Sequence, residues 1–489
     1  MLRASGRFEE AGILVEGERI AAVPGPADSR QIAARDDVDT VKLRRGFLVP
    51  GFVDAHFHLV AGALKQWRCD LGSARSIEDV GALLETYAAK HPGETPVVGV
   101  DWDESDWEDA SFPARALLDG ISTIRPVFAR RICGHVGAVN SVLLKELGAH
   151  GAFVNTDTGV ITERAVARAT ELTRPAPSHV EEGIETAIRH LHTLGVTGIH
   201  DIIEENNVEA YAAGLRRSRV PLRIDGFFHV PPERFADLGA RMRDCGMSDF
   251  RPAGIKVYLD GSIGARTAAL HTPYEDDPTT GTLLVEPGSL RETLRSSADR
   301  GISCAVHAIG DRAVATALGE MQAVGDGRFR IEHAEIIGPA EMELVRGTSV
   351  ALVMQPNFVR NWAGENGLYH RRLGGERWRR NNPFRSLVEA GVRIAFGSDG
   401  MPPGPLYGIR GATHHPNAAE SISAAVALEL YTDAPMRVGA HPGRPAGRLE
   451  PEALCDMVHL SANPLLGDLD GIQILGTWVG GKHVYPDDG

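Results

Sequence analysis

The sequence lacks the features of a membrane-spanning, secreted or disulfide-stabilised protein. Its 489 residues contain no run of about eighteen apolar residues, the length that a bilayer requires. The opening stretch, MLRASGRFEEAGILVEGERI, is interrupted by charges and has no apolar segment typical of a secretory signal. The five cysteines form no Cys-x-x-Cys pair, and this odd, scattered set argues against a disulfide framework or a zinc ribbon. We therefore expect a cytoplasmic protein.

Basic residues are also fewer than acidic residues. The chain has 51 Lys and Arg against 65 Asp and Glu, a formal net charge of −14. This balance argues against a nucleic-acid or anionic-membrane partner and favours a small-molecule substrate. Hydrophobic residues make up 43% and charged residues 24%, as in an ordinary globular protein. The length exceeds what one compact core needs, so we expect more than one folding unit.

What the middle of the chain does contain is a repeating alternation of short apolar runs and helix-length segments. Continuous apolar runs are typical of strands buried on both faces of a parallel sheet. The intervening segments, such as VEEGIETAIRHLHTLG, have helical spacing and end at glycine. This order predicts a (β/α)8 TIM barrel. The eight runs are 47–58, 195–201, 222–229, 254–261, 301–311, 329–335, 349–356 and 391–399.

Two departures from a simple barrel are predicted. About 130 residues separate the first two runs, which indicates an inserted α+β subdomain, or lid, over the barrel mouth. Both chain ends consist of short strand-like pieces, so we expect them to build one small composite β-sandwich. The predicted division is 1–48 for the N-terminal part of the sandwich, 49–69 for the barrel start, 70–180 for the insertion, 181–430 for the rest of the barrel and 431–489 for a C-terminal helix with the remaining part of the sandwich.

Ionisable side chains recur where the apolar runs end. His56 and His58 end the first run, His307 the fifth, His333 the sixth and Asp399 the eighth. The carboxyl ends of barrel strands meet on one face, and residues at i and i+2 point the same way. A single histidine is more often a packing or capping residue. Four histidines and a carboxylate at matched strand ends instead predict a metal site.

Lys256 is unusual because it lies inside an apolar strand, GIKVYLDG, where an unpaired ammonium is costly to bury. One interpretation is that the side chain reaches the barrel mouth or pairs with Asp260. The other is that CO2 has carboxylated Lys256, giving an anionic group whose two oxygens could bridge two metals.

Asp399, in AFGSDG, could orient a metal-bound water, accept its proton and deliver it to a leaving nitrogen. A turn or N-cap role for this aspartate is the structural alternative. With the histidines present, we favour catalysis.

Several motifs resemble the amidohydrolase superfamily and, within it, the amidohydrolase family 3 branch, which includes N-substituted formamide deformylase-like proteins. They lie between about residue 45 and about residue 405 and read PGFVDAHFHL, GHVGAVNS, KVYLDGSIGARTA, VHAIGDRAV, RIEHAE, MQPNF and GSDGMPP. The resemblance implies His-x-His on strand 1, a bridging lysine on strand 4, histidines on strands 5 and 6 and an aspartate on strand 8. This binuclear pattern maps onto His56, His58, Lys256, His307, His333 and Asp399.

The resemblance also implies that GHVGAVNS reaches over the site from the insertion. It makes His135, Asn140, Asp260 and Arg266 candidate substrate contacts. The structural alternatives are helix caps for His135 and Asn140 and a local ion pair for Arg266. After the eighth run, His414, His415 and Asn417 match no role in the family.

The function that follows is hydrolysis of a C–N bond in a small amide, formamide or lactam by metal-activated hydroxide. We expect a divalent metal cofactor, two zinc ions with carboxylated Lys256, and a homodimeric enzyme. Deamination of an aminoheterocycle on the same metal site is an alternative, because fold alone does not separate the two reactions. A non-catalytic scaffold is a further alternative, which the presence of all six ligand positions disfavours. The substrate itself is not fixed by the sequence.

Overall fold

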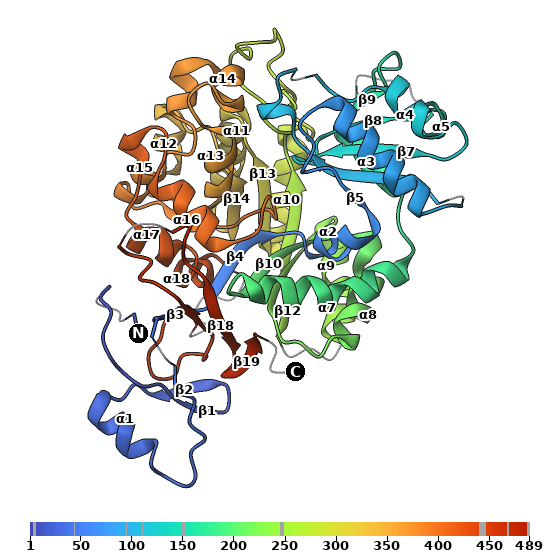
Figure 1. Ribbon diagram of the computed structural model, residues 1–489. Coiled ribbons are helices and arrows are strands. Elements are labelled where there is room, and N and C mark those ends of the chain that lie inside the picture. Colours follow the sequence, from blue (N-terminus) through green and yellow to red (C-terminus); the bar gives the residue numbers. More distant parts are fainter. Residues whose placement is uncertain are drawn as a thin grey trace.

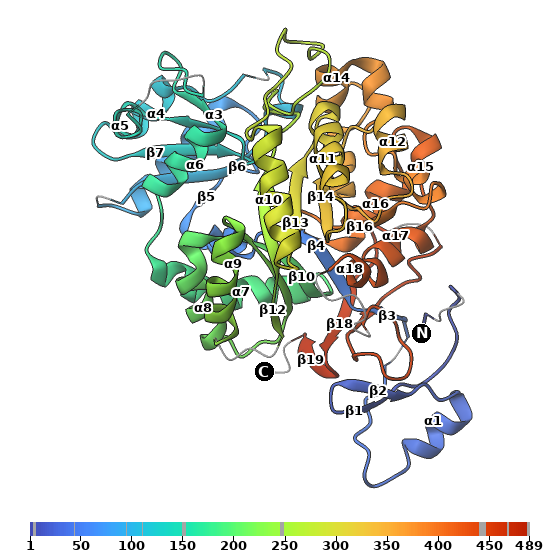
Figure 2. The ribbon, with the colours of Figure 1, turned by 180° about the vertical axis from the view of Figure 1, so that it is seen from behind.

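The computed structural model describes residues 1–489 except 3–5, 44, 94, 110, 149–152, 245–248, 440–445, 467–468 and 487–489. Cys245 therefore lies outside the described residues. The centre of the molecule is a sheet of eight parallel strands arranged in chain order (Figures 1 and 2). The first and last of them meet, because Asp399 N donates to His56 O over 2.8 Å, which closes the predicted barrel. The strands are β4 (Phe52–Phe57), β10 (Val196–Glu204), β11 (Arg223–His229), β12 (Phe250–Tyr258), β13 (Ser303–Ala308), β14 (Phe329–His333), β15 (Ala351–Met354) and β16 (Arg393–Phe396).

Helices surround this sheet, as the alternating pattern predicts. In α7 (Pro177–Thr193) the buried residues Val180, Ile184, Ile188 and Leu191 recur at helical spacing and pack toward the barrel. The other helices around the barrel are α2 (Leu59–Ala63), α8 (Val208–Arg217), α9 (Phe235–Arg243), α10 (Pro287–Asp299), α11 (Asp311–Val324), α12 (Pro339–Val345), α13 (Pro356–Trp362), α14 (Leu368–Arg379), α15 (Phe384–Glu389), α16 (Pro405–Thr413), α17 (Ala424–Leu430) and α18 (Asp433–Val438).

The first predicted run, 47–58, is not one strand. It divides at Gly51 into β3 (Phe47–Pro50), which joins a different sheet, and the barrel strand β4. A Cβ atom at residue 51 would lie 2.2 Å from Thr197 Oγ1, so only glycine allows the chain to pass so close to β10. An apolar run does not reveal such a change of sheet, because both halves are buried.

The segment between β4 and α7 forms a separate five-stranded sheet at the side of the barrel mouth (Figure 1). Val97 packs on the face covered by α3 (Ile77–Lys90) and α4 (Arg115–Ile121). Val98 and Val100 point to the other face, covered by α5 (Ser141–Glu146) and α6 (Glu163–Leu172). This alternation explains why both faces carry helices. The strands of this five-stranded sheet are β5 (Cys69–Asp70), β6 (Val97–Trp102), β7 (Val127–Arg131), β8 (Val136–Val139) and β9 (Val160–Thr162).

The two chain ends share one β layer, which confirms their predicted pairing. The strand β3 pairs antiparallel with β17 (Met457–Leu460), next to β18 (Ile474–Val479) and β19 (Lys482–Tyr485). A hairpin is formed by β1 (Leu14–Glu16) and β2 (Arg19–Ala22), and Arg19 bridges to Leu454. Ile20 and Cys455 are buried in a common cluster. The hairpin and α1 (Pro26–Ile32) project below the barrel (Figure 1).

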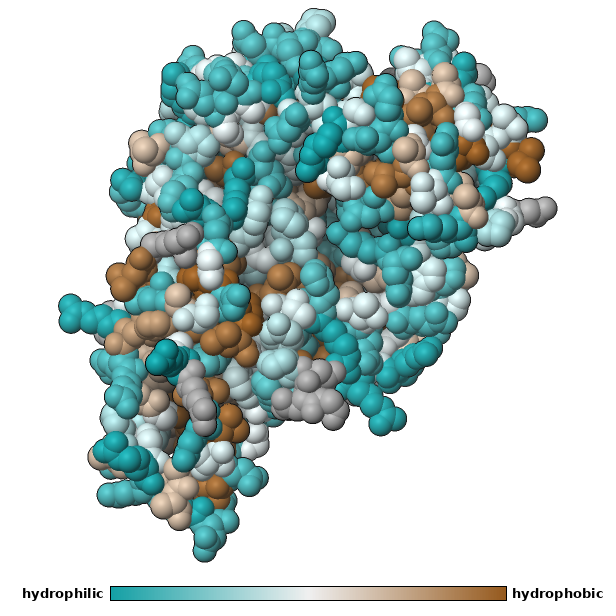
Figure 3. Space-filling model, viewed as in Figure 1, coloured by the Kyte–Doolittle hydropathy of each residue, from teal (hydrophilic) through white to brown (hydrophobic). Residues whose placement is uncertain are grey.

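Hydrophilic side chains cover most of the face seen in Figure 3. Within the described residues, no helix combines the length and apolarity needed to cross a bilayer.

Candidate metal centre

The structure brings the predicted metal-binding side chains together at the carboxyl end of the barrel. His56, His333 and Asp399 each place one donor atom within 4.8 Å of the others. The rings of His56 and His333 have centroids 4.8 Å apart, and His307 lies 4.4 Å from His333 by the same measure. His58 is the most exposed of the four histidines and lies at the rim, 5.5 Å from His56. The strand ends thus converge as the sequence predicts.

Three buried histidines each have one ring nitrogen held by a protein acceptor. His56 Nδ1 lies 2.5 Å from Glu332 Oε2, and His333 Nδ1 lies 2.8 Å from Gln355 Oε1. His307 uses Nε2 instead, 3.0 Å from the carbonyl oxygen of Gly261. An acceptor on one nitrogen places the proton there and leaves the lone pair of the other nitrogen available for a cation.

The protonation state of these rings also suits metal binding. Burial holds the pKa of His56, His307 and His333 well below the usual range, so the rings are neutral near neutral pH. A neutral imidazole is the form that binds metal. The three rings therefore supply donor atoms without a competing proton.

Asp399 stands between His56, in β4, and His58, the residue directly after that strand. Its Oδ1 lies 3.1 Å from His58 Nε2 and 3.6 Å from His56 Nε2. Burial raises the pKa of Asp399, but the hydrogen bond from His58 and the neighbouring His56 outweigh burial, so the pKa lies below its usual value. The residue lies three positions after the end of β16 and has a left-handed backbone conformation, with φ 55°. An ionised carboxylate at this place can bind a cation or accept a proton.

Lys256 is the group that a protein-only site leaves unexplained. It is 1% exposed on β12, and its Nζ has no hydrogen-bond partner among the described residues. Nζ lies 5.0 Å from the centre of the Tyr258 ring. Burial lowers the pKa of Lys256 to about 8, so more of the amine is neutral near neutral pH than in an exposed lysine. An unpartnered buried amine beside free histidine nitrogens fits a site completed by metal.

Of the four candidate substrate contacts, the structure places His135 in the pocket of the metal-binding residues, and it buries Asp260 with Oδ1 3.5 Å from His307 Nε2. His135 Nδ1 is 2.9 Å from Glu163, and the His135 ring centroid is 5.3 Å from that of His307. Burial lowers the pKa of His135, but the Glu163 carboxylate outweighs this effect and raises it to about 9. The ring lines a pocket shared with His307, His333 and Asp399.

The other three candidates have structural partners. The buried Asn140 side chain caps α5 by accepting from Leu143 N and also donates to two carbonyl groups. Asp260 is fully buried and accepts from the backbone amides of three residues, Ala269, Ile309 and Gly310. Arg266 donates to both oxygens of Asp276 and lies in a different pocket. For Asn140 and Arg266 these geometries match the structural alternatives. His415 and Asn417 likewise hold the backbone, at Asn381 and Arg379.

Sequence reasoning missed other residues of the pocket. Glu335 lines it two positions after His333, and burial raises the pKa of Glu335 to about 7. Phe358 and Trp362 on α13 form its aromatic wall, with ring centroids 4.9 Å apart. The second carboxylate of RIEHAE was a visible signal for Glu335. Nothing local marks the α13 residues, because their position depends on how that helix crosses the barrel mouth.

Comparison with known proteins agrees with this geometry. The sequence pattern of the amidohydrolase family matches residues 39–485. The chain belongs to the amidohydrolase family. It is thereby a metal-dependent hydrolase that acts on C–N bonds, which confirms the enzyme class and fold predicted from the motifs.

Three similar proteins illustrate the relationship. The Bacillus subtilis protein YtcJ, which is named as an amidohydrolase, is 28% identical over 92% of this chain and 91% of its own length. The N-substituted formamide deformylase of Arthrobacter pascens is 24% identical over 98% and 95% of the two chains. A metal-dependent hydrolase of Pyrococcus furiosus has a solved structure with TM-score 0.75 and 26% identity, covering 95% of this chain and 97% of its own.

Proposed function

We propose that this amidohydrolase cleaves the C–N bond of a small amide, formamide or lactam-like substrate with a centre of two divalent metals. The observation that carries the proposal is the set of free donor atoms around the unpartnered Lys256 amine. A mixed histidine and carboxylate set is a ligand type that zinc prefers, so zinc is the metal we expect. The residues that would hold the metals are His56, His58, Lys256, His307, His333 and Asp399.

The role proposed for Lys256 requires its carboxylation. The neutral amine attacks the carbon of CO2, an N–C bond forms as the π pair of one C=O bond moves to its oxygen, and the nitrogen gives one proton to water, which leaves a carbamate anion. The lowered pKa of Lys256 favours this step because the reactive form is the free amine. The carbamate replaces a buried positive charge with a negative one, which the neighbouring cations would stabilise. The two oxygens of the carbamate would allow it to bridge two metals.

In the proposed reaction the metals, when bound, lower the pKa of water and polarise the substrate carbonyl. Asp399 accepts the proton of the water that attacks the carbonyl carbon and returns it to the leaving nitrogen. His135 lines the same pocket as His307, with ring centroids 5.3 Å apart, and Glu163 holds its Nδ1, so its Nε2–H can donate to the carbonyl oxygen. The aromatic wall of Phe358 and Trp362 excludes water and packs against the rest of the substrate.

A substrate panel tests this function. The purified zinc-loaded protein would be assayed with N-formyl amines, N-acyl amines, lactams and aminoheterocycles, with release of amine, carboxylate or ammonia as the readout. We expect turnover of one amide-type class, abolished by chelation and restored by zinc. Turnover confined to aminoheterocycles, with ammonia as the product, would replace amide hydrolysis by deamination. No turnover together with no bound metal would contradict the enzymatic proposal.

A further inference from the structure

The interior of this barrel contains a ladder of buried charged and polar side chains where barrels usually have branched apolar residues. In β14 the residues Arg330 and Glu332 are two positions apart and therefore share the inward face. Arg330 is 2% exposed and Glu332 is fully buried. Burying such charges is costly unless each is paired, so their presence calls for a reason.

At its upper end the ladder reaches a proposed metal ligand. Glu332 Oε2 lies 2.5 Å from His56 Nδ1, and Glu332 Oε1 lies 2.5 Å from Arg330 Nε. A carboxylate acceptor at Nδ1 requires the proton of the neutral His56 ring to be on Nδ1. The lone pair of His56 then lies on Nε2, the nitrogen that faces Asp399. Glu332 is thus bound by a cation on one oxygen and fixes the tautomer with the other.

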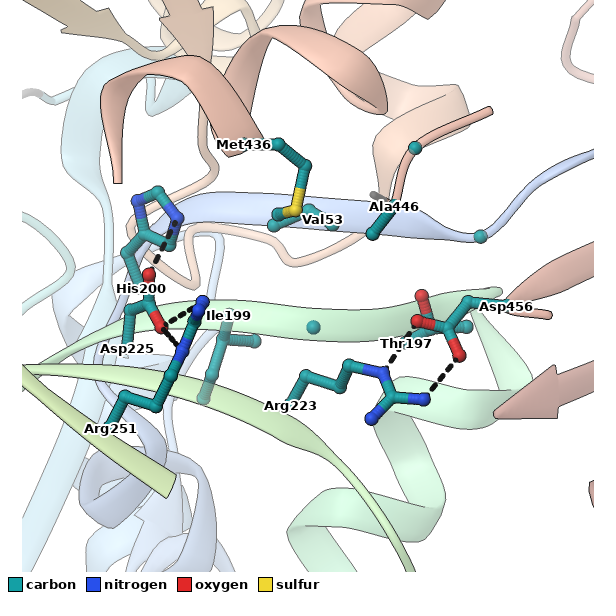
Figure 4. A pocket seen from close by; sticks show the side chains of 13 residues that line it. Val53, Thr197, Ile199, His200, Arg223, Asp225, Arg251, Met436, Ala446 and Asp456 are labelled. Atoms are coloured by element: carbon teal, nitrogen blue, oxygen red, sulfur yellow. Dashed lines mark hydrogen bonds and ion pairs between the residues drawn. The ribbon is translucent and has the colours of Figure 1, made fainter. Parts of the chain in front are cut away.

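Below Glu332 the ladder continues toward the amino end of the barrel. Arg330 lies over the Phe227 ring, 3.9 Å from its centre, and Arg330 Nη1 lies 2.9 Å from His200 Nδ1. His200 faces Asp225, and Asp225 is paired with Arg251 (Figure 4). The guanidinium of Arg330 therefore has the Phe227 ring against one face and a hydrogen bond to His200 at its edge. This leaves Arg330 little freedom to move away from Glu332.

We propose that Glu332 and Arg330 are positioning residues for the metal centre. Glu332 holds the His56 ring with Nε2 toward the metal, and Arg330 holds Glu332. The inference rests on the proposed function, because it assigns the ladder a task only if His56 binds metal. It concerns residues that touch neither substrate nor reacting atoms, so their effect should appear first in metal affinity and ligand geometry.

The test compares metal affinity and the absorption spectrum of the Co2+-substituted protein across a small set of variants. Glu332→Ala removes the acceptor and should weaken metal binding by about 10–100-fold, with an altered Co2+ spectrum. Glu332→Gln keeps an oxygen acceptor for His56 Nδ1–H, so it should lose less affinity and keep a spectrum close to wild type. Affinity would be measured by competition with a chromophoric chelator.

Two further variants keep the test decisive. Glu332→Ala strands the Arg330 charge and could unfold the protein, so Arg330→Met combined with Glu332→Gln removes both charges and retains the acceptor. This double variant should behave like Glu332→Gln. The matched control is Arg223→Met, which removes another buried guanidinium in the barrel, one bonded to Asp456 instead of Glu332, and should leave metal affinity unchanged.

The outcomes separate the two proposals. A wild-type protein that binds stoichiometric metal, with Glu332→Ala equal to it in affinity and Co2+ spectrum, would overturn the positioning role alone. Equal losses in Glu332→Ala and Arg223→Met would do the same, because they would indicate a general loss of packing. A wild-type protein that binds no divalent metal would overturn the proposed function and this inference with it.

Discussion

Two buried cations of the barrel, Arg223 at the amino end and Lys256 at the carboxyl end, differ in how they are bonded. At the amino end every guanidinium nitrogen of Arg223 has an acidic partner, among them both oxygens of Asp456 (Figure 4). At the carboxyl end, within the described residues, Lys256 Nζ has no hydrogen-bond partner, and one nitrogen of His307 and of His333 forms no hydrogen bond. Complete pairing is what stability requires. Unused bonding capacity in a buried cluster instead indicates a site that a ligand completes.

The largest effect should come from removing a ligand at the carboxyl end. We expect His56→Ala to lose metal at one site and activity by several orders of magnitude, with the fold retained, because the substitution removes one of the donor atoms that converge there. Metal analysis would measure the metal content, and circular dichroism would measure whether the fold is retained. The control is His192→Ala, a buried histidine on α7, which should keep its metal. Full metal content in His56→Ala would contradict the assignment of His56 as a metal ligand.

Lys256→Ala should be nearly as severe, but reversible in part. The substitution removes the group proposed to bridge the metals, and short-chain carboxylic acids should restore some activity by occupying the vacated space. Activity would be followed against acetate and propionate concentration. Lys145→Ala, at an exposed position in α5, should show full activity and no response to either acid. Undiminished activity in Lys256→Ala would remove the lysine from the mechanism.

A smaller effect is expected at the lid. His135→Ala should lower kcat by about 10²–10³-fold, the usual loss for one donor to a developing oxyanion, without loss of metal. His135→Gln, which keeps an N–H donor, should recover part of this loss. Asn140→Ala is the structural comparison, since it removes the α5 cap and should cost about 1 kcal/mol of stability while kcat stays near wild type. Equal kcat losses at both positions would argue against a direct role for His135.

The smallest effect on catalysis should come from the amino end. Arg223→Met leaves Asp456 buried without its partner and should cost about 3–5 kcal/mol of folding free energy. Denaturant unfolding would measure this loss, and kcat of the folded variant should match wild type. A large fall in kcat without destabilisation would show that the amino end contributes to the reaction and does not serve stability alone.

The sequence predicted those features that repeat along the chain. Strand–helix alternation predicted the barrel, and the position of His307 or Asp399 directly after an apolar run was enough to place it at the carboxyl end. Contacts across the barrel were beyond this reasoning. Glu332 stands next to His333, yet its partner is His56, 276 residues away, and only the closed barrel brings them together. Asn140 and Asp260 were candidate substrate contacts because a polar residue in a motif can either contact a substrate or bond to the backbone, and the sequence does not distinguish the two roles.

The most direct test of the account is electron density for the metal-loaded protein, with anomalous data collected at the zinc edge. We predict two metal peaks, one near His56, His58 and Asp399 and one near His307 and His333, with a carboxylated Lys256 between them. A single peak on His56, His58 and Asp399 together with an unmodified Lys256 would contradict the binuclear centre.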